Sequence, residues 1–297
     1  MFEHYPIRGH LVHLDASWRA LIEHRDYPAE IRRILGEAVV ASLLLAATIK
    51  FEGVLSLQLQ GTGRVHLLLA QCTSGLGVRG LARYHEENSA AGAGASELIG
   101  AGNLTVTLET DDGSQRYQGV VPITSGRLAD SLQAYFEKSE QLPTRLWLYA
   151  DEHGAAGMLL QRLPGEETRS AAGAAAPAED HAAVDDAWRR VQMIGETLTE
   201  DELRTLADAQ ILHRLFNEDD VRLFEPAPVY FRCRCSRERV SGMLQGLGEA
   251  ETSAVLAERG EVEVRCDFCN RAYVFDAVDV AQLFNAAVAG GAGGSVH

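Results

Sequence analysis

Four of the five cysteines in this 297-residue chain stand in two close pairs, and their spacing constrains the fold more than any other feature. Cys233 and Cys235 form a C-x-C pair, and Cys266 and Cys269 form a C-x-x-C pair 30 residues further on. Each pair can present two sulfurs to one ion if the chain between the pairs folds back. Four thiolates suit tetrahedral zinc, so the spacing predicts one zinc ion in a small C-terminal domain over residues 232–287.

The segments beside the pairs agree with such a domain. Strand patterns at 229–231 and 261–264 lead into the pairs, a third at 271–275 leaves the second pair, and Asp276 is placed to cap a last helix. A module this small buries little apolar surface, so metal binding, worth about 10–16 kcal/mol in comparable peptides, would supply most of its folding free energy. Residues 288–297 are expected to be a flexible tail.

Arginines crowd both cysteine pairs, and they bear on the reactivity of the thiols. They are Arg232, Arg234, Arg237, Arg239, Arg265 and Arg271. Positive charge favours the thiolate, which is the form that oxidants attack. If each pair were oxidised to its own disulfide, all four ligands would be lost and the ion released. A purely structural zinc site is the alternative, and the residues leave both interpretations open.

The charge and the N-terminus limit the compartment and the partners. The formal net charge of −15 argues against a protein that grips nucleic acid or lies on an anionic membrane. The first ten residues lack the features of a secretory signal, and the longest nearly apolar stretch, 38–49, is too short to cross a bilayer. We therefore expect a cytoplasmic protein, in which cysteines are metal ligands or redox-active thiols rather than structural disulfides.

Residues 1–176 mix strand and helix patterns without regular βαβ repeats, which predicts an α+β domain. Two β-hairpins are expected, over 54–70 and 104–121. A helix that begins near Pro28 and ends near Ile49 is apolar on most of its surface and should be central. The fifth cysteine, Cys72, falls in an apolar strand pattern and is expected to be a buried spectator.

A stretch of small residues at 170–177 marks a boundary, and the segment 177–231 after it is acidic. That segment holds 13 acidic and 5 basic residues, and so eight of the 15 excess negative charges. It is also amphipathic, with Trp188 and Val191 on one helix face and a capping box at 199–202. Helices this short are marginal alone, so the segment must pack on a neighbour. It is either a packed connector or a regulatory element that unfolds.

Other motifs carry less weight. Residues 75–80 match the dinucleotide pattern G-x-G-x-x-G, but no phosphate-binding helix follows, which favours a glycine-rich turn. His10 and His13 lie in a strand-like segment and would point to opposite faces, so they do not form a metal site. No set of catalytic residues is discernible, and we predict that the protein is not an enzyme.

Several segments together resemble a known family. They are FRCRCSRER at 231–239, CDFC at 266–269 with YVFD at 273–276, LFEP at 223–226, YQGVVP at 117–122 and SEQLPT at 139–144. In this order, and over about residues 5 to 285, the sequence resembles the redox-regulated holdase chaperones of the 33-kDa heat-shock protein family.

The resemblance implies an N-terminal domain for client binding and dimerisation, a metastable linker and a C-terminal zinc domain, in the cytoplasm. It implies that the reduced, zinc-bound form is inactive. Oxidants such as peroxide with heat then join Cys233 with Cys235 and Cys266 with Cys269, zinc leaves, and the zinc domain and linker unfold. The active form, typically a homodimer, binds unfolding proteins without ATP. We expect heat or mild acid to loosen the linker helices in a second step.

Two alternatives from other classes remain. One is a nucleic-acid-binding zinc ribbon. Every segment of the chain has a net negative charge, which counts against this alternative. The other is a thiol oxidoreductase that uses Cys266 and Cys269 as free thiols.

Overall fold

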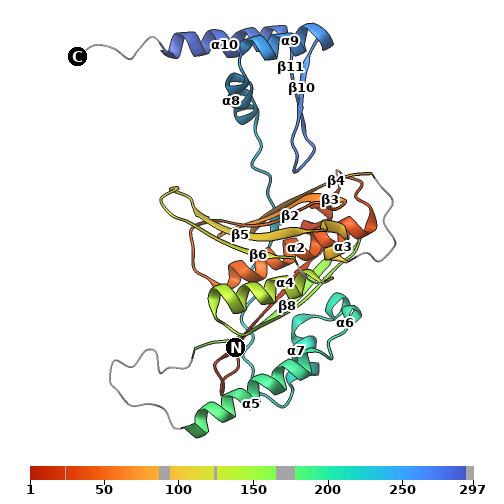
Figure 1. Ribbon diagram of the computed structural model, residues 1–297, viewed down its shortest axis with the longest axis vertical. Coiled ribbons are helices and arrows are strands. Elements are labelled where there is room, and N and C mark those ends of the chain that lie inside the picture. The colour runs from red at the N-terminus through yellow and green to blue at the C-terminus, as the bar shows by residue number, and fades with distance from the viewer. Residues whose placement is uncertain (24, 87–93, 124–125, 165–177, 292–297) are drawn as a thin grey trace, which may run out of the picture. The chain divides into compact units, whose positions relative to one another are not determined.

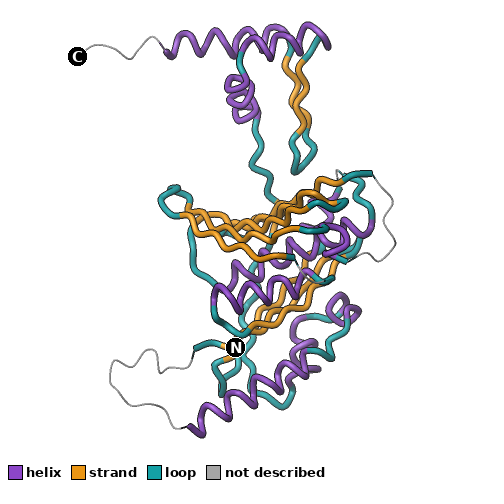
Figure 2. The backbone as a smooth tube through the Cα atoms, viewed as in Figure 1, coloured by secondary structure: helices purple, strands orange, loops and turns teal. Residues whose placement is uncertain are grey.

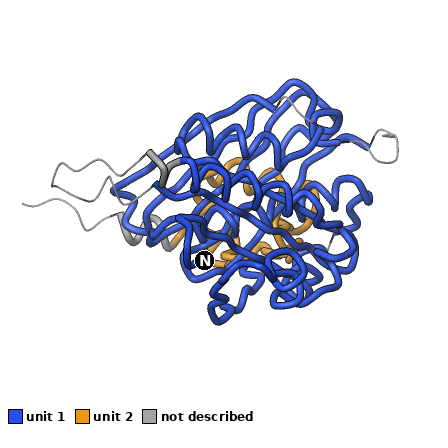
Figure 3. Tube along the Cα trace, turned by 90° about the horizontal axis from the view of Figure 1, so that it is seen from below, with its two compact units in different colours: residues 1–232 blue, residues 233–297 orange. Residues whose placement is uncertain are grey.

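The computed structural model describes residues 1–297 apart from 24, 87–93, 124–125, 165–177 and 292–297. The chain divides into two compact units, Met1–Arg232 and Cys233–His297 (Figure 3). The expected boundary at 170–177 lies outside the described residues. Residues 178–231, which the sequence sets apart as an acidic linker, belong to the first unit.

The first unit contains a six-stranded sheet in the order β6-β5-β2-β3-β4-β9 and a three-stranded sheet in the order β1-β8-β7 (Figures 1 and 2). Its elements are β1 (Ile7–Leu14), α1 (Ala16–Ile22), α2 (Ala29–Thr48), β2 (Gly53–Gly61), β3 (Val65–Thr73), β4 (Gly77–Tyr84), α3 (Ala95–Ile99), β5 (Gly102–Thr110), β6 (Arg116–Pro122), α4 (Leu128–Tyr135), η1 (Phe136–Glu140), β7 (Thr144–Ala150), β8 (Ala155–Arg162), α5 (Ala178–Gly195), α6 (Glu200–Thr205), α7 (Asp208–Phe216) and β9 (Tyr230–Phe231). The predicted α+β class is confirmed, and so are the two hairpins, which are β2–β3 and β5–β6.

Helix α2 lies between the two sheets and is buried along most of its length (Figure 1). Its side chains pack with those of both sheets in one hydrophobic core. This explains why its apolar residues do not keep to one stripe, since a helix covered on all sides has no solvent face. The prediction of a central helix is confirmed.

Strand β8 is buried on both faces, and the sequence analysis did not predict it. Leu159 belongs to the core around α2, whereas Met158 and Leu160 belong to a second core on the opposite face of the sheet. At Gly157, an added Cβ would lie 2.5 Å from Val40 of α2, so the glycine lets sheet and helix approach closely. A strand buried on both faces lacks polar alternation, which is the pattern that indicates most strands.

The expected glycine-rich turn at 75–80 is wrong in most of its length, because β4 begins at Gly77. An added Cβ at Gly80 would lie 3.0 Å from Leu35 and 3.1 Å from Val39, both on α2. Gly80 therefore provides room for the helix rather than forming a turn.

The acidic segment forms α5, α6 and α7, which cover the face of the three-stranded sheet that α2 does not (Figure 1). The predicted capping box is present, since the Thr199 hydroxyl accepts from the Glu202 amide at 3.2 Å and the Glu202 carboxylate accepts from the Thr199 amide at 3.0 Å. After α7, β9 pairs in parallel with β4. The strand expected at 229–231 to lead into the metal domain therefore belongs to the six-stranded sheet of the first unit.

The second unit is small. Its elements are α8 (Arg237–Leu247), α9 (Glu249–Arg259), β10 (Val262–Arg265), β11 (Ala272–Phe275) and α10 (Ala277–Gly291). Strands β10 and β11 form an antiparallel hairpin, as predicted, whereas α8 and α9 were not predicted. Asp276 accepts hydrogen bonds from the amides of Val278 and Asp279 and so begins α10, as expected. That helix continues to Gly291, into the first residues of the expected tail.

Within the described ranges, no helix combines the length and the apolar character that crossing a membrane requires.

Candidate metal centre

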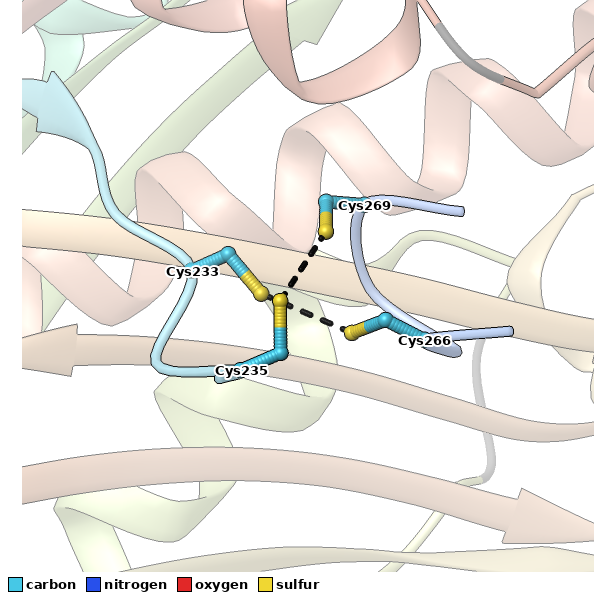
Figure 4. A group of neighbouring side chains, drawn as sticks. All are labelled: Cys233, Cys235, Cys266 and Cys269. Atoms are coloured by element: carbon cyan, nitrogen blue, oxygen red, sulfur yellow. Dashed lines mark hydrogen bonds between the residues drawn. The ribbon is translucent and has the colours of Figure 1, made fainter. Parts of the chain in front are cut away.

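The sulfurs of Cys233, Cys235, Cys266 and Cys269 lie together in the second unit, all within 4.8 Å of one another (Figure 4). The first two come from the loop that precedes α8, and the other two from the turn between β10 and β11. The Sγ atoms of Cys233 and Cys266 are 3.5 Å apart, and those of Cys235 and Cys269 are 3.4 Å apart. The structure thus brings together all four predicted ligands.

Local backbone geometry shapes the loop that carries each pair. In the β10–β11 turn, the amide of Asn270 donates to the carbonyl of Cys266 at 2.8 Å, and the amide of Cys266 donates to the carbonyl of Arg271 at 3.0 Å. Asn270 has a φ of 55°, which asparagine tolerates better than most residues. After the first pair, the Ser236 hydroxyl accepts from the Arg239 amide at 3.3 Å and begins α8, which turns the chain away from the site.

The arrangement fits one tetrahedral metal ion. With metal–sulfur bonds of about 2.3 Å, neighbouring sulfurs of a tetrahedral site lie about 3.8 Å apart. The distances of 3.4 and 3.5 Å, and the limit of 4.8 Å on the whole set, are close to that value. Four sulfur donors around one point could therefore hold a metal ion.

Tyr273 on β11 is a polar neighbour of the sulfurs to which the sequence did not point. Its hydroxyl donates to the sulfur of Cys235 at 3.1 Å, and its ring is buried in the core of the unit. Burial pulls the pKa of Cys235 up, but the hydrogen bonds from Tyr273 and the neighbouring thiols outweigh it and lower the pKa to about 7. Burial is also the main reason why the pKa of Cys233 and that of Cys269 are raised. These hydrogen bonds therefore favour the thiolate of Cys235.

The sequence signal for this role is a tyrosine in a strand pattern next to a cysteine pair. If its ring is buried, its hydroxyl needs a hydrogen-bond partner.

The arginines do not all serve the sulfurs. Arg237 forms an ion pair with Asp279 at 2.7 Å and lies 4.2 Å from the ring centre of Phe275. Arg265 pairs with Glu263 at 2.5 Å. Arg271 is different, since its hydrogen bond with Tyr273, and then the charges of the nearby cysteines, raise its pKa. Fewer arginines therefore act on the sulfurs than the sequence suggests. Arg237 and Arg265 form ion pairs that stabilise the fold instead.

Cys72 is fully buried in the core of the first unit, on β3, as predicted. Burial raises the pKa of its thiol to about 12, which disfavours the thiolate that oxidants attack.

All five cysteines are free thiols in this structure. The two sulfur contacts given above join the first pair to the second, as expected of four groups around one centre. The implied disulfides, Cys233 with Cys235 and Cys266 with Cys269, concern the oxidised protein and stay a prediction.

Comparisons with known proteins agree on one family. A family model described as "Hsp33 protein" matches residues 1–276. The chain is 44% identical over 285 residues to the 33 kDa chaperonin of Methylobacillus flagellatus, covering 96% of this chain and 92% of that protein. It is 45% identical over 284 residues, with the same coverage, to the 33 kDa chaperonin of Nitrosococcus oceani. The crystal structure of the 33 kDa chaperonin from Thermotoga maritima has the same fold, with a TM-score of 0.80 at 22% identity and 97% of each chain covered.

Replacing one cysteine of the four should abolish tight metal binding. We expect Cys233→Ser to lose most of the single metal equivalent, because three thiolates hold the ion more weakly than four, and to open residues 233–285 to trypsin. Metal analysis of the purified protein and tryptic mapping measure both effects. Cys72→Ala, a cysteine far from the site in sequence, should keep the full equivalent. Unchanged metal content in Cys233→Ser would contradict the ligand assignment.

Removing the Tyr273 hydroxyl should weaken the site without dismantling it. We expect Tyr273→Phe to keep the fold and to lower metal affinity about tenfold, because a thiolate loses its hydrogen-bond donor. Competition with a chromophoric chelator measures the affinity. Tyr230→Phe, at a half-exposed tyrosine on β9, is the control and should leave it unchanged. Equal affinities in the two variants would show that the hydroxyl does not support Cys235.

Proposed function

The chain belongs to the Hsp33 family, a family of chaperones rather than enzymes, and from this premise we propose that it is a redox-regulated, ATP-independent holdase. Oxidation of the four-cysteine site would convert it from an inactive to a client-binding form. The observation that carries the proposal is the cluster of four half-buried sulfurs within 4.8 Å in a unit with a small core.

We propose zinc as the ion of this site and Cys233, Cys235, Cys266 and Cys269 as its ligands. Four sulfur donors favour zinc among the common divalent ions, and bound zinc would supply folding free energy to the unit. Over the described residues, the core of the second unit consists of few buried side chains, which are Val240, Leu244, Val262, Tyr273, Phe275 and Val280. A core of this size gives little stability alone, so the unit depends on its sulfur ligands.

The trigger would be oxidation within each pair. Formation of the Cys233–Cys235 bond removes two electrons from its two sulfurs, and the Cys266–Cys269 bond removes two more. One hydrogen peroxide molecule accepts each electron pair and, with two protons, becomes two water molecules. With no thiolate left as a ligand, the second unit loses the metal-dependent part of its folding free energy. Because Tyr273 contacts Cys235 and also lies in the core, the same oxidation disturbs the packing.

The acidic segment 177–231 would be the relay, which means the part that transmits the change from the second unit to the first. The sheet face that it covers would be the surface that binds clients. On the sheet side this second core includes Trp147, Met158 and Leu160, and on the helical side Trp188, Val191, Ile211 and Leu215. Each such side chain gains about 1.5–3 kcal/mol from burial. Helices α6 and α7 are shorter than an isolated helix needs to be, so they depend on docking to stay folded. Detachment would expose both apolar surfaces together.

The relay joins the metal unit through β9. The amide of Arg232 donates to the carbonyl of Val78 at 2.9 Å, and that of Tyr230 donates to the carbonyl of Leu76 at 3.3 Å. Cys233 follows Arg232 directly. Val229 and Phe231 also pack against the main core of the first unit, so this short strand anchors the end of the acidic segment. We propose that unfolding of residues 233–287 frees this anchor and, with heat, the segment 177–231 that precedes it.

The remaining parts of the proposal follow from the family. The N-terminal domain, 1–176, would bind unfolding or partly unfolded client proteins and form the homodimer of the active state. The protein would act in the cytoplasm, under oxidative and heat stress.

Oxidation should release zinc and switch on holdase activity together. After hydrogen peroxide at elevated temperature, we expect the zinc-loaded protein to lose its one equivalent of zinc and to suppress aggregation of a heat-denatured test protein. A zinc-sensitive dye and light scattering measure the two events, and mass mapping of the disulfides checks the pairing. The untreated protein and Cys72→Ala, treated in the same way, are the controls. Zinc retained with no gain in holdase activity would sink the proposal.

Detaching the acidic segment by mutation should activate the reduced protein. Val191 is fully buried against the sheet, whereas Met193 on the same helix is 66% exposed. We expect Val191→Asp to bind a hydrophobic dye and to suppress aggregation without oxidant while keeping its zinc, because a buried charge expels the helix. Met193→Asp should behave like the unaltered protein. A folded Val191→Asp protein that exposes the sheet but binds no client would place the client surface elsewhere.

A further inference from the structure

His13 lies at the junction between the three-stranded sheet and the acidic segment. It stands near the end of β1, and its ring reaches two linker helices that are about 190 residues later in the chain. The Nδ1 atom is 2.9 Å from a carboxylate oxygen of Asp208, at the start of α7. The Nε2 atom is 2.8 Å from the backbone carbonyl of Leu203, in α6. Both side chains of the His13–Asp208 pair are largely shielded from solvent.

Both partners of the ring are acceptors. A carboxylate and a backbone carbonyl have no proton to donate at these positions, so both ring nitrogens must donate. Neutral imidazole carries one N–H and can satisfy one partner, whereas imidazolium carries two. In the neutral ring, a lone pair would face an oxygen at about 3 Å. The geometry is therefore that of a charged His13.

The charged groups around the ring are negative. Asp208 lies at the start of α7, and Asp15 is the residue that directly follows β1. Across the sheet, His13 pairs with Ala156 of β8, which does not titrate. The hydrogen bond with Asp208, acting against burial and helped by Leu203 and Asp15, raises the pKa of His13. The same hydrogen bond lowers the pKa of Asp208.

We propose that His13 is a proton-controlled latch, which holds α6 and α7 on the three-stranded sheet while it is imidazolium and weakens their docking when it loses its proton. The latch joins one sheet strand to both short helices, at a polar edge of the second hydrophobic core. It acts in the reduced, metal-loaded protein and needs no change at the cysteines.

The direction of the pH dependence follows from the two shifts. His13 has a pKa raised above 6.5, so its contribution is complete below that pH and is lost as the pH rises through the raised value. Asp208 has a pKa lowered below 3.8, so its contribution is present above that pH and is lost as the pH falls through the lowered value. Docking by this pair is strongest between these limits. Lowering the pH through the raised pKa of His13 into this range therefore tightens the docking of α6 and α7 rather than loosening it.

The latch has a consequence for activation that rests on the proposed function. If the acidic segment covers the client surface, the reduced protein should be harder to activate at mildly acidic pH than at alkaline pH. The latch itself concerns only the docking of α6 and α7, so it can be tested without oxidant or client.

Hydrogen exchange of the reduced, zinc-loaded full chain tests the latch. Exchange of peptides from residues 199–216 is followed by mass spectrometry from pH ~5.5 to ~8.5, with rates corrected for intrinsic exchange. We expect protection of α6 and α7 to fall about three- to tenfold as the pH rises, since one pKa unit corresponds to a tenfold change. His13→Gln should remove this dependence, with protection at pH ~5.5 close to that of the unaltered protein at pH ~8.5.

Two further variants isolate the pair. Asp208→Asn keeps an acceptor oxygen but no charge, and it should also flatten the profile. His213→Gln removes an exposed histidine from the same helix, α7, and should leave the profile unchanged. Full pH dependence in both His13→Gln and Asp208→Asn would overturn the latch. So would an imidazole nitrogen spectrum showing neutral His13 at pH ~6, a measurement that needs no substitution.

Discussion

The three-stranded sheet has two apolar faces, and the rest of the structure depends on how each is covered. Helix α2 covers one face and lies in the main core, between both sheets. The other face is covered by α5, α6 and α7, of which the last two are too short to fold alone. Apolar burial on one side of the sheet is thus part of the main core, whereas on the other side it depends on the docking of short helices. A protein that hides such a face under marginal helices has a surface that it can expose without unfolding its main core.

The second unit uses a different source of stability. Its buried side chains are few, and the four sulfurs gather where the chain between the two pairs folds back. Tyr273 joins these two parts, because its ring lies in the core and its hydroxyl contacts Cys235. Chemical change at the sulfurs therefore reaches the packing directly. Under the proposed function, oxidation removes the support of the second unit, and the short strand β9, which lies just before Cys233, passes the change to the helices that cover the sheet of the first unit.

Among the strands, sequence patterns predicted those that have one polar face and one apolar face, and missed those that do not. The hairpins β2–β3 and β5–β6 alternate with period two, and their prediction is confirmed. Strand β8 does not alternate, because side chains on both of its faces are buried. Strand β4 was predicted as a turn because of its glycines, of which Gly80 allows close contact with α2. At the candidate metal centre, the cysteine spacing predicted the four sulfurs that the structure brings together, whereas Tyr273 was found only from its contact with Cys235.

By itself, the sequence determined the four-cysteine set, the acidic amphipathic character of residues 177–231, the central apolar helix and the α+β class. Each of these follows from residue type and short-range periodicity, which act within a few residues of the chain. Only the tertiary structure decided which apolar face the acidic segment covers, that β9 joins the six-stranded sheet, and that His13 meets Asp208. These contacts join residues far apart in the chain. They depend on how the sheets and helices pack, which no local pattern of residues encodes.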